Sequence, residues 1–315
     1  MSLLVNLTLV FVAGLITALA TGIGAIPFFF VEDFSDRWNV ALWGIASGIM
    51  VAASLFGLIN EGLAYASGGV PTLMLGGLVA GVVLVEVADR VLDAANVGGD
   101  GGHDTAHEHD HADDHDADAA AAAVEESEAL PDGDGGTHSH DHPIDVEAFA
   151  EGDLKKLVLI LGILTVHSFP EGVAVGVSFA ELGLEGGIDV FGIAVPLLAV
   201  FMTIAISIHN IPEGTAIAIP MRAMGLSKWR MVGAAVFSSL PQPIGAVIAF
   251  AFVTWAESFL PFGFGFAAGA MIYLVLTEFI PEALATGVDL PRHGYGELAT
   301  GIVAGVLLML PLLYV

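Results

Sequence analysis

The sequence contains no cysteine. This absence excludes disulfide scaffolds, thiol catalysis and zinc sites built from thiolates. Charge is also scarce, because only 14% of the 315 residues are charged, whereas soluble domains contain about 25%. Hydrophobic residues make up 56% of the chain, and mean hydropathy is +0.81. Such a chain exposes a large surface that water does not solvate, so we predict an all-α polytopic membrane protein.

Basic residues are the scarcest charged group, with eight Lys and Arg against 35 Asp and Glu, which gives a net charge of −27. An acidic excess repels phosphate backbones, so nucleic acid is excluded as a partner. About half of the carboxylates are concentrated in one segment, because residues 96–153 hold 18 of the 35, together with eight of the 11 histidines. The remainder resembles the acidic composition of proteins from high-salt organisms.

Uncharged segments long enough to cross a bilayer fill most of the chain. A helix needs roughly 20 apolar residues to cross the hydrocarbon core, and residues 1–31 contain no charged side chain. This first segment lacks the basic start of a cleaved signal peptide, so we expect a retained helix. We predict eight transmembrane helices, at 1–31, 40–64, 68–88, 154–180, 190–221, 231–256, 259–285 and 297–315.

The basic residues also predict the orientation of these helices. All eight lie in or directly beside the loops that join spans 1 and 2, 3 and 4, 5 and 6, and 7 and 8. Basic residues mark the cytoplasmic side of a membrane protein. We therefore expect both termini to be extracellular, in a multi-pass protein of the cell membrane.

The chain is predicted to form one membrane domain that a polar loop interrupts. Residues 1–95 carry spans 1 to 3, and residues 154–315 carry spans 4 to 8. Residues 96–153 form a low-complexity cytoplasmic loop rich in His and Asp, which we predict to be disordered. Its eight histidines favour loose binding or sensing of transition metals, with a plain solvated linker as the alternative.

One six-residue pattern occurs twice, as His167-Ser168-Phe169-Pro170-Glu171-Gly172 and as His209-Asn210-Ile211-Pro212-Glu213-Gly214. In each copy His and Glu are four residues apart and therefore share one helix face. Spans 4 and 5 run in opposite directions, so the two motifs can meet at the bilayer midplane and surround one divalent cation. Each ionisable group costs at least ~2.5 kcal/mol at that depth, which favours a functional site over a contact that merely holds helices together.

The prolines and glycines of the motifs fit the same interpretation. Pro170 and Pro212 lack an N–H, so the carbonyls four residues before them lose their helical partners. Such carbonyls are tolerated in lipid only beside a cavity or a ligand. The glycines that follow let neighbouring helices approach closely.

These motifs, with the span pattern and the His-rich loop, resemble the ZIP (Zrt/Irt-like) metal transporter family in its GufA-like prokaryotic branch. The resemblance covers the whole chain and implies eight helices, both ends outside, and uptake of zinc. It also implies a primary transport site formed by His167, Glu171, His209 and Glu213. Asn210 matches a position that in some members helps to bind a second metal.

Two residues depart from the family pattern. Ser168 stands where the family often has Asn, and Gln242 stands where the span-6 motif usually has Glu. Gln242 can coordinate as a neutral amide but cannot neutralise a second cation. We therefore expect one tightly bound metal ion among the helices.

Three further carboxylates lie within or at the ends of spans. Glu61, near the outer end of span 2, is a candidate outer gate residue, with a purely structural role as the alternative. Glu278, below the middle of span 7, is a candidate exit ligand, an assignment that the family resemblance supports. Asp89, at the inner end of span 3, is expected to pair with its neighbour Arg90.

The donor atoms define the substrate class. Imidazole and carboxylate without thiolate suit Zn²⁺, Fe²⁺, Mn²⁺, Co²⁺ or Cd²⁺ rather than Cu⁺ or Ca²⁺. We predict a carrier or a slow channel whose partners are the metal ion and the lipid bilayer. No cofactor is expected. The sequence leaves open whether the protein forms a homodimer. An intramembrane zinc hydrolase is disfavoured because no HExxH occurs and four protein ligands would close the site. A metal-sensing receptor would need a folded cytoplasmic domain, which the loop is not.

Overall fold

The computed structural model describes residues 3–31, 35–65, 70–96, 154–183, 187–190 and 192–311. Within these ranges the chain is helical apart from turns and one antiparallel hairpin, formed by β1 (Ile188–Val190) and β2 (Ile193–Val195). Apart from its first residue, the predicted polar loop at 96–153 lies outside the described residues. The all-α fold class is therefore confirmed for the part of the chain that is described.

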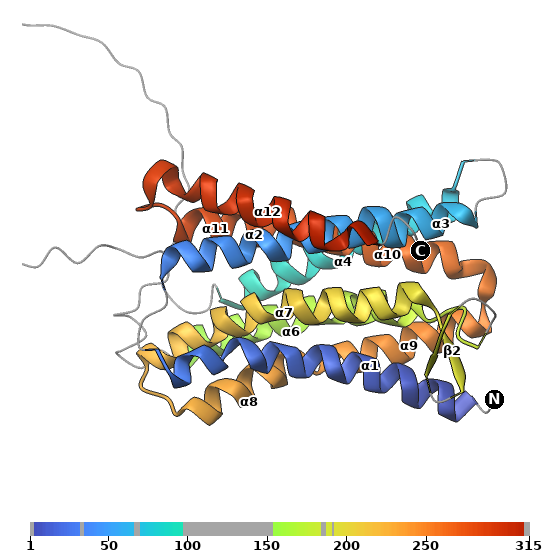
Figure 1. Cartoon of the computed structure of the whole chain (residues 1–315), viewed down its shortest axis with the longest axis horizontal. Helices are drawn as coiled ribbons and strands as arrows, with labels where there is room; N and C mark the ends of the chain where they lie inside the picture. Colours follow the sequence, from blue (N-terminus) through green and yellow to red (C-terminus); the bar gives the residue numbers. More distant parts are fainter. Residues whose placement is uncertain are drawn as a thin grey trace, which may run out of the picture.

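The helices form two groups, which lie one above the other in Figure 1. The lower group contains α1 (Leu3–Gly24), α6 (Leu154–Ser178), α7 (Leu197–Ala223), α8 (Lys228–Ser238) and α9 (Pro241–Trp255). The upper group contains α2 (Asp36–Ala52), α3 (Asn60–Ala64), α4 (Thr72–Asn96), α10 (Leu260–Leu274), α11 (Ile280–Thr286) and α12 (Tyr295–Met309). Three short 3-10 turns, at Ile26–Phe29, Glu257–Phe259 and Pro291–Gly294, join helices at the ends of the bundle.

Six helical segments are long and apolar enough to cross a membrane: Leu3–Gly24, Asp36–Ala64, Thr72–Val91, Leu197–Ala223, Lys228–Trp255 and Glu257–Thr286. They correspond to six of the eight predicted spans. The other two predicted spans coincide with α6 and α12, and their passage through the membrane stays a prediction. Large apolar side chains remain exposed along the helices, for example Ile16 (50%), Val79 (60%) and Val303 (58%). Such a surface suits lipid rather than water.

Three of the predicted spans contain irregular turns. The span expected at 231–256 is two helices, because α8 ends at Ser238 and α9 begins at Pro241, which lacks the N–H that would continue the first helix. The second span continues from α2 into the π-helical segment η2 (Ala53–Ile59), and the seventh continues from α10 into the π-helical segment η4 (Val275–Phe279). Segments of this kind are rare and often lie at functional sites.

Glycines set the closest approaches between helices. A Cβ added at Gly172 of α6 would overlap the carbonyl oxygen of Gln242 on α9. A Cβ added at Gly214 of α7 would overlap the carbonyl oxygen of Thr21 on α1. The motif glycines therefore bring α1, α6, α7 and α9 together at one level of the bundle.

The two ends of the bundle differ in what they carry. In Figure 1, α1 begins and α12 ends toward the right, while the junctions between α7 and α8 and between α11 and α12 lie at the left. These two junctions contain basic residues, including Arg222, Lys228 and Arg292. Basic residues at one end of the bundle agree with the sequence analysis, which expects the Lys and Arg residues on one side of the membrane. The assignment of this end to the cytoplasm stays a prediction.

Candidate metal centre

Both sequence motifs lie inside long helices, the first in α6 and the second in α7. Three of the four predicted primary ligands come together there. Glu171, His209 and Glu213 each offer one ligand atom, and these atoms all lie within 4.8 Å of one another. All three side chains are buried. The duplicated motif thus builds one compact cluster of an imidazole and two carboxyl groups.

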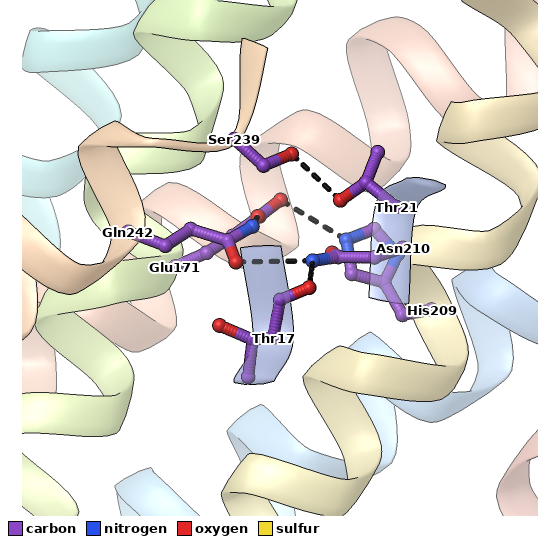
Figure 2. Close-up of polar contacts among 7 residues, drawn as sticks. All are labelled: Thr17, Thr21, Glu171, His209, Asn210, Ser239 and Gln242. Atoms are coloured by element: carbon purple, nitrogen blue, oxygen red, sulfur yellow. Dashed lines mark hydrogen bonds and ion pairs between the residues drawn. The ribbon is translucent and has the colours of Figure 1, made fainter. Parts of the chain in front are cut away.

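Glu171 is held in place from two sides (Figure 2). His209 Nε2 lies 3.0 Å from Glu171 Oε1. The side-chain amide of Gln242 donates from Nε2 to Glu171 Oε2 over 2.5 Å. A carboxylate that accepts hydrogen bonds at both oxygens is fixed in orientation, which leaves its remaining lone pairs for a cation.

Asn210 and Gln242 form a bridge of amides beside this cluster. Asn210 Nδ2 donates to the carbonyl oxygen of Thr17 over 2.7 Å and to Oε1 of Gln242 over 3.0 Å (Figure 2). The predicted second-site residues are therefore engaged with each other and with Glu171. Gln242 uses its nitrogen toward Glu171 and its oxygen toward Asn210, so both ends of its amide are occupied.

Sequence reasoning missed the contribution of α1. Besides the Thr17 carbonyl, the hydroxyl of Thr21 lies 2.7 Å from that of Ser239, at the break between α8 and α9 (Figure 2). Both threonines are fully buried. Their spacing of four residues, in a stretch of α1 that is otherwise apolar from Leu9 to Gly24, is a signal that would have placed one polar face of α1 against the site.

Four buried polar atoms near this cluster have no hydrogen-bond partner among the described residues: Ser168 Oγ, His209 Nδ1, Asn210 Oδ1 and Glu213 Oε1. Leaving such atoms unsatisfied costs roughly 1–3 kcal/mol each. The three oxygen atoms carry lone pairs in any protonation state. His209 Nδ1 also carries a lone pair in the tautomer whose hydrogen is on Nε2. The arrangement therefore suits a cation that accepts nitrogen and oxygen donors.

His167 is not part of this cluster. Its ring is buried, and Nε2 lies 2.8 Å from Oδ1 of Asp89 on α4. The expected pair between Asp89 and Arg90 is wrong, because Arg90 Nε donates to Glu86 Oε1 over 2.6 Å. Arg90 lies one helical turn beyond Glu86, whereas adjacent residues such as Asp89 and Arg90 point in different directions from a helix.

The two remaining predicted residues, Glu278 and Glu61, are not members of the cluster. Glu278 is half-buried on η4, next to Phe279, whose ring stacks on that of His209 with centroids 5.1 Å apart. Glu61 is half-buried on α3, one turn before Tyr65. Sequence reasoning did not identify Phe279 as a neighbour of the site, because nothing in its local sequence sets it apart from other aromatic residues.

The C-terminal end of α3 carries a contact between the two helix groups. The hydroxyl of Tyr65 donates to Oε1 of Glu181, which follows α6, over 2.7 Å. Burial, followed by this hydrogen bond to Glu181, raises the pKa of the Tyr65 phenol. Tyr65 therefore stays neutral and keeps its hydrogen to donate.

Comparison with known proteins relates this geometry to a family. The family model described as ZIP zinc transporter matches residues 3–312. An Arabidopsis thaliana protein provisionally named a zinc transporter is 33% identical over 84% of this chain and 33% of its own length. The zinc transporter GufA of Myxococcus xanthus is 36% identical over 49% of this chain and 54% of its own length. For the zinc transporter ZIPB of Bordetella bronchiseptica the identity is 39%, over 48% of this chain and 43% of its own. The chain thus spans between a third and about half of the length of these relatives.

Proposed function

Because this chain belongs to the ZIP zinc transporter family, we propose that it carries divalent transition metal ions, with zinc as the first candidate, into the cytoplasm. Proteins of this family cross the membrane several times, and six helices here have the required length and composition. The observation that carries the proposal is the buried cluster of Glu171, His209 and Glu213. Three ionisable groups at membrane depth are expensive unless they serve a function.

The chemistry of the cluster fits a small divalent cation. Zinc binds imidazole nitrogen and carboxylate oxygen at about 2.0–2.2 Å, which places tetrahedral ligand atoms about 3.3 Å apart. The ligand atoms here lie within 4.8 Å of one another, so small side-chain movements would close them around an ion. Two carboxylates would neutralise the two charges of the ion in surroundings that solvate charge poorly.

We propose His167 as the fourth ligand, in a position that it does not occupy in this structure. It precedes Glu171 by one helical turn on α6, and its ring is held by Asp89. A rotation of the side chain away from Asp89 would bring the imidazole to the face that Glu171 occupies. Ser168 and Asn210 would complete the surroundings of the ion with neutral oxygen atoms, both without partners among the described residues.

The expected orientation of the helices distinguishes the two ends of the pathway, whereas uptake is proposed from the family resemblance alone. With the basic end in the cytoplasm, Glu61 lies near the outer end of the pathway, and Glu278 and Asp89 lie on its inner side. We assign Glu61 to the entrance and Glu278 to the exit on this basis. The family consists of transporters, so we propose no catalytic reaction and no resident cofactor.

Metal uptake into proteoliposomes tests the function directly. The native protein should take up zinc, and a panel of Fe²⁺, Mn²⁺, Co²⁺ and Cd²⁺ would rank the substrates. Glu213→Gln keeps the shape of the side chain and removes the charge. Loss of a residue that hydrogen-bonds to a metal ligand typically lowers metal affinity or activity about 10–100-fold. Loss of a ligand itself should therefore slow uptake by about 100-fold or more.

A matched control is Glu297→Gln on α12. Glu297 is partly exposed and lies 3.4 Å from Arg37, in a surface ion pair of the kind that contributes little. It should transport at the native rate. Native uptake by Glu213→Gln would remove the metal centre from the proposal, and no uptake of any metal by the folded native protein would overturn the proposed function.

A further inference from the structure

The buried face of α2 carries polar residues that the metal centre does not use. Asn39, Trp43 and Ser54 are 7%, 3% and 0% exposed. Steps of four and eleven residues return to the same side of a helix. These three side chains therefore share one stripe along α2 and into the π-helical segment η2.

The opposite face of α2 is closed by α12. A Cβ at Gly44 would overlap the carbonyl oxygen of Leu298, and a Cβ at Gly48 would overlap that of Ile302. At 100° per residue, these two glycines lie about 80° to 180° around the helix from the three stripe residues. The stripe consequently points away from α12.

On its own side the stripe approaches the metal centre through one aromatic ring, that of Phe279. The ring of Trp43 contacts that of Phe279 with centroids 4.9 Å apart, and Phe279 stacks on His209. α2 also packs directly against α7, the helix that carries His209 and Glu213. The stripe therefore runs along the boundary between the two helix groups, beside the proposed site.

Each of the three residues has a polar atom with no partner among the described residues: Asn39 Oδ1, Trp43 Nε1 and Ser54 Oγ. A buried polar atom without a partner costs roughly 1–3 kcal/mol. Ser47 of the same helix shows the ordinary alternative, because its hydroxyl donates to the Trp43 carbonyl over 2.8 Å. Three such atoms on one stripe require water or another polar partner at three successive depths.

We propose that Asn39, Trp43 and Ser54 form the water-bearing wall along which the hydrated metal ion reaches and leaves the centre. This assignment rests on the proposed transport function. Asn39 and Ser54 present oxygen atoms to the ion or to its water shell, and the Trp43 N–H donates to a water oxygen. At about 1.5 Å per residue, Asn39 and Ser54 lie roughly 22 Å apart, which is most of a hydrocarbon core about 30 Å thick.

The natural absence of cysteine allows a direct test. Ser54→Cys and Asn39→Cys would each introduce a single thiol, to be challenged with a water-soluble methanethiosulfonate reagent during zinc uptake. The control is Ser178→Cys, at a site equally buried whose hydroxyl donates to the Val175 carbonyl over 2.6 Å. Modification is measured by mass spectrometry, so it is read independently of whether the native protein takes up zinc.

We expect both stripe thiols to react at least about tenfold faster than the control thiol. Saturating Zn²⁺ should slow these reactions, and modification should block uptake. If neither stripe thiol reacts faster than the control thiol, the water-soluble reagent does not reach the stripe. That result would overturn the proposal.

A second measurement does not depend on introduced thiols. Trp43→Phe keeps an aromatic ring against Phe279 and removes only the N–H. It should lower the maximal uptake rate about threefold to tenfold while leaving the KM for zinc near the native value. Ser47→Ala, which removes a hydroxyl that is already satisfied within its own helix, should leave the rate unchanged. Equal rates for native protein and Trp43→Phe would contradict a role of this N–H in the wall.

Discussion

Replacing Gln242 by Glu should create a second tight metal site beside the first. In the native protein the Gln242 amide donates to Glu171 Oε2 over 2.5 Å and accepts from Asn210 over 3.0 Å. Gln242→Glu puts a carboxylate oxygen where the donating nitrogen was. Two carboxylate oxygens would then face each other in a buried setting, unless a proton or a cation lies between them.

The size of the effect can be worked from this geometry. Loss of a hydrogen bond to a charged group costs roughly 1.5–3 kcal/mol. Two like charges about 4 Å apart repel by about 4 kcal/mol at an effective dielectric constant near 20. A second cation relieves the repulsion, and about 4 kcal/mol corresponds to roughly a thousandfold in binding affinity.

Calorimetric titration with zinc at pH 8 measures the change. Native protein and Gln242→Glu are compared with residues 96–153 deleted from both, which removes the eight loop histidines from the count. Gln242→Met is the matched control, since it loses the hydrogen bond without gaining a charge. We expect one additional tight event in Gln242→Glu alone. Two tight sites already present among the native helices, or no difference between the Glu and Met variants, would refute the reasoning.

Three further predictions concern the site and its supports. Zinc affinity should fall as pH drops from 7 to 5, because the ion binds neutral imidazole and ionised carboxylate and must displace protons; a flat titration curve would contradict this. Gly214→Ala should destabilise the protein by about 1–3 kcal/mol or more, because its Cβ would overlap the Thr21 carbonyl, and thermal unfolding in detergent measures the loss. Tyr65→Phe should cost about 1 kcal/mol at pH 7. Since the pKa of Tyr65 is raised, this contribution is present below about pH 10 and is lost as pH rises through the pKa of the folded protein, so unfolding of the variant should depend less on alkaline pH.

The sequence was sufficient to predict the apolar spans and the meeting of the two motifs. Long uncharged runs identify helices by length alone, and six of them reappear with ends that differ from the predicted ones by up to seven residues. The four-residue spacing of His209 and Glu213 fixed their common face, and Glu171 meets them as the antiparallel motifs required. These features depend on local periodicity, which a single sequence records.

Features that depend on contacts between distant helices were not accessible in the same way. Spacing along α6 gives the face of His167 but not its rotamer, which Asp89 on α4 selects through a hydrogen bond. The break between α8 and α9 was missed although Pro241 marks it, because the span from Lys228 to Trp255 stays apolar as a whole. Its turn is stabilised by a partner on another helix, the Thr21 hydroxyl.

The position of Gln242 beside Glu171 has a physical explanation in the residue that follows Glu171. Gly172 contacts the backbone of Gln242, and Gly176, one turn later, contacts that of Ala246, so α6 and α9 run parallel in a constant register. A side chain at Gly172 would push α9 away and take the Gln242 amide out of reach of Glu171. The glycine of each motif therefore does more than allow close packing. It determines which side chain of the neighbouring helix stands next to the proposed ligand, and it couples the composition of the metal centre to the register of the helices around it.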